Sequence, residues 1–394
     1  MKLTTFAALY FAYKMKGFFS ITMNKIYWLV LLYASLSITY AQQQQPLNPA
    51  QEEKNTPVEL LHAGKLVGSV INNEKVRIVV KDSTNNVGFK QNNSLLFCDS
   101  AIHFLAQNKV NAYQNIRIID SDGTIITGDS LLYDGTTRIA RLRGNVVLTD
   151  ENRTVSTCCM DYNLKTKVGN YFNGGTVVDN GTTLVSEKGY YFTTSKIVYF
   201  RGNVDYRSPD TQLRSDTLTY NLAQKKVIFN TKTYIKTKDG EVVTNKGYHL
   251  TESGKSFLEG RSKIDNPEYA ISGDQLDYNK KTGKGIAKGN VEFYNKKDNI
   301  IILGDLGKHD DKIKRSEVYG NAVMIKPIEE KGKLRPVDTL FLSADTLIAV
   351  NDTSKAKPRR LYAYNHVKMF RSDFQAKCDS LVYQITDSTL HFYY

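Results

Sequence analysis

A column of aspartates, one near the start of each copy of a repeated segment, holds the residues of this chain best suited to chemistry. Its members are Asp99, Asp129, Asp216, Asp274, Asp305, Asp345 and Asp379, while Cys158, Lys188 and Lys246 occupy the same position in other copies. Carboxylates at regular intervals could bind calcium ions or form the acid and base pair of a hydrolase. Lysine at two of these positions fits neither chemistry. We therefore expect these aspartates to be structural, each starting a strand and bonding locally to the backbone.

The other residues that could carry chemistry lack the spacing that it requires. Six histidines are present, and none forms a metal-binding pair such as H-x-x-x-H. The sequence contains no nucleophile elbow, phosphate-binding loop or dinucleotide-binding glycine motif. Its four cysteines lack C-x-x-C spacing, and Cys98 and Cys158 lie two repeat units apart, about 19 Å at the usual strand spacing. The sequence thus predicts free, mostly buried thiols, no catalytic residue, no metal, no cofactor and no enzymatic activity.

These residues belong to an internal repeat of roughly 30 residues. Thr127–Tyr133 (TGDSLLY) precedes Ala140–Leu148 (ARLRGNVVL), and Ser272–Tyr278 (SGDQLDY) likewise precedes Ala287–Phe293 (AKGNVEF). The position of Tyr133 recurs at intervals of 28 to 31 residues, with longer intervals of 40 and 34 near the end. The residues at this position are His103, Tyr133, Tyr162, Phe192, Tyr220, Leu250, Tyr278, His309, Ala349 and Tyr383.

Each repeat unit is expected to contain two strands with a Gly-Asn corner before the second. Asp129, Leu131 and Tyr133 share one face of the first strand, because side chains alternate along a strand. Glycine adopts positive φ without strain and asparagine tolerates it, which suits a turn. Such a unit leaves no room for a helix, and 25 tyrosines with only 8 prolines also favour strands. The residues themselves therefore predict an all-β solenoid or a long rolled sheet.

The N-terminal region differs from the repeat and has the pattern of an export signal. From Met23, the expected translation start, a lysine precedes an apolar run (Ile26–Leu36) that ends in the small-residue site Thr39–Ala41. We expect a signal peptide over 1–41, with an uncleaved membrane anchor as the alternative. A polar tether over 42–57 and one continuous repeat domain over 58–394, cut mid-repeat at its C-terminus, are expected to follow. Cleavage would remove four lysines from a formal charge of +13 and leave +9, which suits an anionic lipid headgroup or polysaccharide better than nucleic acid.

The GDxLxY…GNVxxx unit resembles the OstA-like domain of the lipopolysaccharide-transport proteins, the family of the LptA-like periplasmic bridge. The copies run from residue 60 to residue 394. The resemblance implies an elongated, open β-jelly-roll, V-shaped in section, of about ten two-strand repeats. It implies a periplasmic location with association at the outer membrane, and partners among the other lipopolysaccharide-transport proteins through edge-strand addition or end-to-end self-association. The chain is longer than the compact bridge, as expected of a Bacteroidetes-type form.

The resemblance also implies that the apolar interior shields the acyl chains of lipopolysaccharide during transfer to the outer membrane, without catalysis. Parity places the apolar side chains of each unit on one face, and stacking aligns them into a stripe. We expect the acyl-chain track to consist of Leu131, Tyr133, Val146, Leu148, Leu218, Tyr220, Leu276, Tyr278, Val291 and Phe293. The basic stretches Lys331–Arg335 and Lys355–Arg360 are expected to receive phosphates at its rim. Two alternatives stay open: a structural or adhesive β-solenoid with a filled core, and a polysaccharide-active β-helix enzyme.

Overall fold

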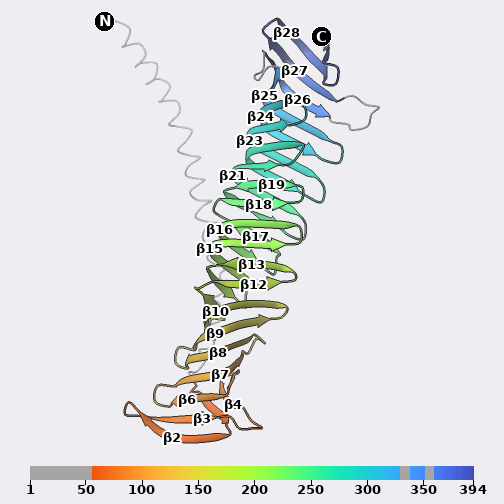
Figure 1. Cartoon of the computed structure of the whole chain (residues 1–394). Coiled ribbons are helices and arrows are strands. Elements are labelled where there is room, and N and C mark those ends of the chain that lie inside the picture. Colours follow the sequence, from red (N-terminus) through yellow and green to blue (C-terminus); the bar gives the residue numbers. More distant parts are fainter. Residues whose placement is uncertain (1–55, 329–337, 351–358) are drawn as a thin grey trace, which may run out of the picture. The chain divides into compact units, whose positions relative to one another are not determined.

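The computed structural model describes residues 56–328, 338–350 and 359–394, in which the regular elements are β-strands. Thr56–Tyr394 form one compact unit, whose 29 strands hydrogen-bond into a single antiparallel sheet. The strands follow one another in chain order along the stack, from β2 in orange to β28 in blue (Figure 1). The predicted elongated all-β fold is thereby confirmed. The expected signal peptide over 1–41 lies outside the described residues, as does the tether up to residue 55.

The strands divide into short ones that lie on one side of the stack and long ones that cross a bend. The first sixteen are β1 (Glu59–His62), β2 (Lys65–Ile71), β3 (Glu74–Val80), β4 (Val87–Gln91), β5 (Ser94–Cys98), β6 (Ser100–Phe104), β7 (Lys109–Ile119), β8 (Ile125–Asp134), β9 (Ile139–Asp150), β10 (Arg153–Asn163), β11 (Val168–Tyr171), β12 (Gly175–Asp179), β13 (Thr182–Ser186), β14 (Lys188–Phe192), β15 (Ile197–Ser208) and β16 (Thr211–Asn221). The others are β17 (Lys226–Phe229), β18 (Thr233–Thr237), β19 (Gly240–Thr244), β20 (Lys246–Leu250), β21 (Lys255–Asp265), β22 (Tyr269–Asn279), β23 (Lys284–Asn295), β24 (Ile300–Asp310), β25 (Arg315–Ile328), β26 (Asp338–Val350), β27 (Arg360–Arg371), β28 (Phe374–Gln384) and β29 (Thr389–Tyr393).

The Gly-Asn pair forms a bend inside one long strand rather than a turn between two strands. In β9 both Gly144 (φ 76°) and Asn145 (φ 44°) adopt the left-handed conformation, and the pairing register with β8 shifts there. A Cβ on Gly144 would lie 2.4 Å from a carboxylate oxygen of Asp129, so the position requires glycine. The bend divides the sheet into two arms. Arm A contains strand halves such as 139–143, which end in turns at 135–138 and equivalent positions, and arm B contains halves such as 146–150, which end in tight hairpins.

The carboxylates of the aspartate column accept hydrogen bonds from the asparagines of these bends. Asn145 donates a hydrogen bond from its side chain to Asp129 across 2.8 Å, so the partner is a side chain of the next strand and not the local backbone as expected. The same bond joins Asn115 to Asp99 (2.9 Å), Asn203 to Glu187 (2.5 Å), Asn290 to Asp274 (2.7 Å) and Asn321 to Asp305 (3.0 Å). Glu187, rather than Lys188, therefore holds the acidic position in its repeat. A structural role for the column agrees with this network.

The predicted aromatic column is displaced by one residue in two repeats. Tyr191 and His249, not Phe192 and Leu250, pair with the inward-facing Val198 and Val227. A slip of one residue moves a side chain to the opposite face of a sheet, so Phe192 and Leu250 face outward. With this correction, the inward positions from Tyr133 to Tyr278 recur every 29 residues.

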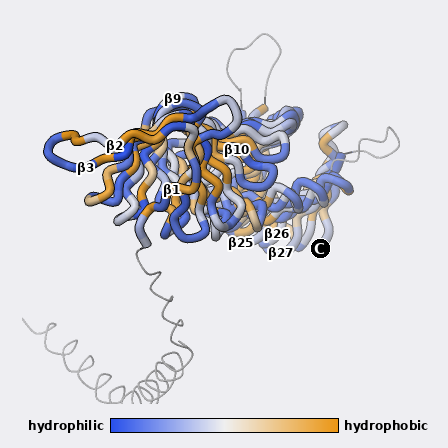
Figure 2. The backbone as a smooth tube through the Cα atoms, turned by 90° about the horizontal axis from the view of Figure 1, so that it is seen from below, coloured by the Kyte–Doolittle hydropathy of each residue, from blue (hydrophilic) through white to orange (hydrophobic). Residues whose placement is uncertain are grey.

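Both arms turn one face toward a shared interior. Along β9 and β10 buried and accessible side chains alternate, and Figure 2 shows hydrophobic and hydrophilic residues alternating along the strands in a view down the stack. Leu142 of arm A and Leu148 of arm B are both fully buried in the same core. The described residues form no helix of the length and hydropathy that a transmembrane span requires.

Candidate functional site

One row of inward-facing side chains crosses arm B in continuous register and reveals where the interior is filled. From β8 to β16 the residues of this row are at most 5% exposed: Ile126, Leu148, Val155, Val177, Leu184, Tyr206 and Leu213. The next four, Ile235, Val242, Ile264 and Ile271, are only partly buried. Phe293, which follows, is again only 4% exposed. We call β18, β19, β21 and β22 the open stretch.

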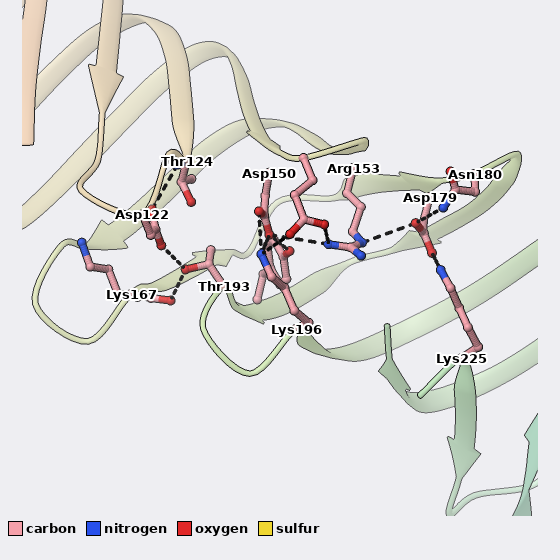
Figure 3. A network of polar contacts seen from close by, with 12 residues as sticks. Asp122, Thr124, Asp150, Arg153, Lys167, Asp179, Asn180, Thr193, Lys196 and Lys225 are labelled. Atoms are coloured by element: carbon pink, nitrogen blue, oxygen red, sulfur yellow. Dashed lines mark hydrogen bonds and ion pairs between the residues drawn. The ribbon is translucent and has the colours of Figure 1, made fainter. Parts of the chain in front are cut away.

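Before the open stretch, polar clusters join the ends of the two arms. Asp120, Asp150 and Asp179 end arm B segments and are at most 4% exposed. Each carboxylate accepts a hydrogen bond from a tyrosine and forms an ion pair with a lysine of arm A, and Figure 3 shows part of this network. The three sets, which we call clasps, are Asp120 with Tyr162 (2.9 Å) and Lys167 (2.5 Å), Asp150 with Tyr191 and Lys196 (2.6 Å), and Asp179 with Tyr220 (3.3 Å) and Lys225 (2.9 Å).

Ion pairs as well as hydrogen bonds stabilise the clasps. Burial raises the pKa of Tyr162, Tyr191 and Tyr220 well above the ordinary value, and the adjacent carboxylates add to this shift. The phenols therefore stay protonated and donate to the aspartates. Each carboxylate is withdrawn from water but compensated by an ammonium group, which makes the set costly to break at any one member. The clasps thus hold the ends of the two arms together. We call the opening between these ends the mouth, and the clasps close it.

The clasp residues are replaced in the next two repeats. Ser208 and Thr237 stand where Asp150 and Asp179 stand, at the end of arm B before a hairpin. Gly254 and Gly283 occupy the turn position, with positive φ, that Lys196 and Lys225 hold in the clasps. The arms are joined there instead by an exposed ion pair between Lys280 and Asp239 (3.1 Å). The loss of clasps coincides with the open stretch.

Beyond the open stretch a different set of contacts brings the arms together again. Asp311 accepts hydrogen bonds from the hydroxyls of Tyr269 (3.0 Å) and Tyr278 (3.2 Å) and lies 2.9 Å from Nε2 of His309. The hydrogen bond with His309 lowers the pKa of Asp311 below its ordinary value. Higher in the stack, Arg359 bonds to the buried Asp298, and Lys326 donates to the hydroxyl of Tyr383 across 2.6 Å.

An apolar pocket lies between the clasped region, which runs from β8 to β17, and this second set of contacts. Its empty volume, part of which is open to solvent, is about 520 Å³. Apolar residues from both arms line it, among them Ile264, Ile271, Leu276, Val291, Phe293 and Val318. The hydrophobic core divides into two clusters at the same place, one ending at Val291 and the other beginning at Tyr269.

Small residues create the space in this pocket. Gly285, Ala287 and Gly307 lie on neighbouring strands of its wall. In the clasped region the corresponding space is filled, because the ring of Tyr171 lies 2.4 Å from the position that a Cβ of Gly189 would take. The space therefore arises at Gly307, whose cross-strand neighbour is Ala287, whereas the neighbour of Gly189 is Tyr171.

The ten predicted track residues all face the interior, and the structure divides them among three places. Leu276, Tyr278, Val291 and Phe293 line the pocket. Leu131 and Tyr133 line a smaller pocket of about 300 Å³ near β4 and β5. Val146, Leu148, Leu218 and Tyr220 lie in the filled core of the clasped region, each at most 2% exposed. The proposed contact of these residues with lipid remains a prediction.

Several pocket residues were missed from the sequence. Ile264 and Ile271 belong to the lining, together with Gly285, Ala287 and Gly307. Glycine at 254 and 283, in place of the turn lysines, is the sequence signal that could have located the pocket. The predicted basic stretches over 331–335 and 355–358 fall outside the described residues.

Metal and thiol chemistry has little support in the described structure. Its histidines, cysteines and acids form no cluster of three or more that could hold a metal ion. All four cysteines are free: Cys98 and Cys378 are buried as expected, whereas Cys158 is exposed and Cys159 half-buried. All four thiols are thus free as predicted, and two of the four are buried.

Comparison with known proteins finds similarity to a solved structure and to a family model. A periplasmic protein of known crystal structure, LptH of Pseudomonas aeruginosa, described as the LptA-homologous component of the lipopolysaccharide transport device, matches at 13% identity. The match covers 32% of this chain and 80% of that one, with a TM-score of 0.26. No curated protein matches the sequence. Residues 55–216 match the model of the OstA-like proteins, the family that the repeat resembles.

Proposed function

We propose that this chain is a non-enzymatic periplasmic lipid-binding protein that shields acyl chains of lipopolysaccharide during transfer to the outer membrane. The observation that carries the proposal is the apolar pocket at the interruption of the clasps. The match of residues 55–216 to the OstA-like model, and the resemblance of the repeat to the lipopolysaccharide-transport proteins, support the choice of lipid. The expected signal peptide supports the location.

The energetics of such a site require no catalysis. Burying one methylene in an apolar site is worth about 0.8 kcal/mol, so six methylenes would contribute about 5 kcal/mol. The partly buried Ile235, Val242, Ile264 and Ile271 offer apolar surface beside the pocket, toward the unclasped mouth. An acyl chain could therefore enter from the side, without threading through the filled core.

The partners follow from an edge of the described sheet. Within the described residues β2 pairs with β3 alone. Exposed apolar side chains accompany this edge, including Leu66 and Val70 on β2. A free edge of this kind accepts strands from another chain. We propose that other lipopolysaccharide-transport proteins, or further copies of this chain, add strands there.

Photocrosslinking in living cells tests the lipid site directly. A photoreactive phenylalanine, p-benzoylphenylalanine, would replace Tyr278 or Phe293 in the pocket, and Phe229 in the clasped core as the matched control. We expect an adduct with lipopolysaccharide from both pocket positions and none from Phe229, which is 0% exposed. Folded protein that gives no lipid adduct at either pocket position would contradict the proposed function.

A structural rod with a filled core is the second candidate. The interior row from Ile126 to Leu213 favours it, because that part of the described chain leaves hardly any room for a ligand. A rod would purify without lipid. The photoreactive residue would give no lipid adduct at position 278, just as at the control position 229. No observation in the described residues favours the alternative of a polysaccharide-active enzyme.

A further inference from the structure

The outer face of arm A carries an exposed aromatic surface that the interior site does not use. Six outward-facing residues on consecutive strands pair directly with one another: Tyr190, Tyr199, Thr219, Ile228, Tyr248 and Phe257. Tyr190 and Tyr199 are 47% and 46% exposed. We call this row, with its outward-facing neighbours on β14 to β17 and β20, the aromatic face. Exposed aromatic groups in one contiguous patch mark an interaction site more often than scattered ones do.

Unpaired cations border the aromatic face. Lys188 and Arg201 are exposed neighbours of the tyrosines, and neither forms an ion pair in the described structure. Nζ of Lys226 lies 4.1 Å from the centre of the Tyr248 ring. The outward positions of β14, β17, β20 and the arm A parts of β15 and β16 hold no carboxylate.

In the neighbouring parts of arm A the exposed cations form ion pairs with carboxylates of adjacent strands. On the β9 and β10 side, Arg141 lies 3.8 Å from Asp161, and on the β21 and β22 side Lys255 lies 3.3 Å from Asp277. Cross-strand pairing of this kind is the ordinary way to neutralise charges on an exposed sheet. On the aromatic face Lys246 is paired in this way with Glu259 (3.5 Å), whereas Lys188 and Arg201 are not, so the charge of these two is available to an anionic ligand.

The centre of the aromatic face is largely polar, which discriminates between kinds of ligand. Tyr199 and Tyr248 lie three strand steps apart, about 14 Å at the usual spacing. Between them β16 presents Thr217, Thr219 and Asn221 outward, and β17 presents Lys226 and Ile228. A protein partner would have to bury these polar groups at the middle of its interface, where unpaired groups are costly. A ligand rich in hydroxyl groups would instead form hydrogen bonds with them.

We propose that the aromatic face binds an anionic oligosaccharide. Apolar C–H faces of sugar rings would pack on the two aromatic pairs, since the negative face of an aromatic ring attracts them. Phosphate or carboxylate groups would bind Lys188 and Arg201. Resting on the proposed function, the saccharide part of a carried lipopolysaccharide is one source of this chemistry, and a free anionic polysaccharide is the other.

Binding measurements with a defined probe test the proposal. The probe is the phosphorylated oligosaccharide of deacylated lipopolysaccharide, titrated calorimetrically into the full chain. We expect Tyr199→Ala and Arg201→Gln each to weaken binding about tenfold, because each removes a central contact. Removal of the phosphates from the probe should weaken binding similarly. Tyr113→Ala, which alters a tyrosine 42% exposed on the same arm, is the matched control and should leave the affinity unchanged. Absence of binding, or binding unaffected by Tyr199→Ala, would overturn the proposal.

Crosslinking in cells separates this site from the interior one. With p-benzoylphenylalanine in place of Tyr199, a glycan adduct supports the proposal. Loss of this adduct in cells that make only the lipid part of lipopolysaccharide identifies the carried lipid as the source, and its persistence identifies a free polysaccharide. A discrete protein adduct, or no adduct, refutes the proposal. Because the probe at Tyr278 reports on the acyl chain independently, either site can fail while the other stands.

Discussion

The clasped region from β8 to β17 and the open stretch have the same repeat and the same inward apolar row, yet only the first is closed. Leu184 in the clasped region is fully buried, whereas Val242 at the equivalent level of the open stretch is only partly buried. The residues of the interior are equally apolar in both. The difference lies at the ends of the arms, where Asp150 and Lys196 face each other in one region and Ser208 and Gly254 in the other.

The comparison teaches that the mouth, rather than the interior, controls access to the core. A buried carboxylate paired with an ammonium group adds little net stability, because the cost of desolvating both charges offsets their attraction. The clasps are therefore better understood as closures that fix the distance between the arms. Serine and threonine at the same positions bond within their own hairpins, as Thr237 does to Gly240 (3.2 Å), and leave the arms apart.

The largest expected difference between the regions concerns a buried charge. Leu184→Asp places a carboxylate in the filled core, where neither water nor a cation can compensate it, and should lower the free energy of unfolding by about 4 kcal/mol. Val291→Asp places the same group beside the pocket, where water can hydrate it, and should cost about 2 kcal/mol. Urea denaturation followed by circular dichroism measures both.

The same pair of variants tests the pocket. The folded Val291→Asp protein should lose lipid crosslinking from position 278, because the charge lies on the wall that an acyl chain would contact. If Val291→Asp unfolds the protein as severely as Leu184→Asp, the pocket behaves as dry core, and the comparison between the regions fails.

Next in size is the loss of one clasp member. Lys196→Met leaves Asp150, which is 4% exposed, without its nearest cation, and should destabilise the protein by about 3 kcal/mol. Lys280→Met removes the exposed pair across the open stretch and should cost less than about 1 kcal/mol. Denaturation midpoints of the two variants give the comparison, and equal losses would show that the clasps do not differ from surface ion pairs.

A clasp can also be transferred into the open stretch. Ser208, His249 and Gly254 have the spacing of Asp150, Tyr191 and Lys196, 41 and 46 residues from the first member to the others. A Cβ at Gly254 would meet other atoms no closer than 3.4 Å, and the clasp lysines already adopt positive φ. The triple variant Ser208→Asp, His249→Tyr, Gly254→Lys should therefore fold with a stability within about 1 kcal/mol of the native chain.

Its effect should appear in access to the interior. Closing this mouth should reduce lipid crosslinking at position 278 several-fold, while hydrogen exchange slows in β18 and β19. The single variant Gly254→Lys, which has no carboxylate to meet, is the control. Slowed exchange with undiminished crosslinking would show that lipid does not enter through this mouth.

The sequence was sufficient for the repeat but not for the distribution of open and closed regions. Alternation and the Gly-Asn spacing predict the all-β fold, because both depend on neighbouring residues. The displacement at Phe192 and Leu250 is not visible in the sequence because the neighbouring Tyr191 and His249 are themselves aromatic, and only the pairing with Val198 and Val227 shows which residue faces inward. Ile235 and Ile264 look like any core residue, and their exposure depends on contacts between residues more than 40 positions apart. Pairing at that separation is not visible in a single repeat.

The smallest expected effect is a dependence on acidity at the upper boundary of the open stretch. The hydrogen bond with His309 holds the pKa of Asp311 below its ordinary value of 3.8. A carboxyl whose pKa is lowered by folding stabilises the protein at pH values above its ordinary pKa. This contribution disappears as the pH falls through the pKa of the folded state. Asp311→Asn should therefore cost about 1 kcal/mol at pH 5 and progressively less below pH 3.8. Urea denaturation at pH 5 and at acid pH measures this, with Asp210→Asn in an exposed hairpin as the control. A loss that stays constant with pH would mean that Asp311 acts by packing alone, and that its charge does not hold the arms together beyond the pocket.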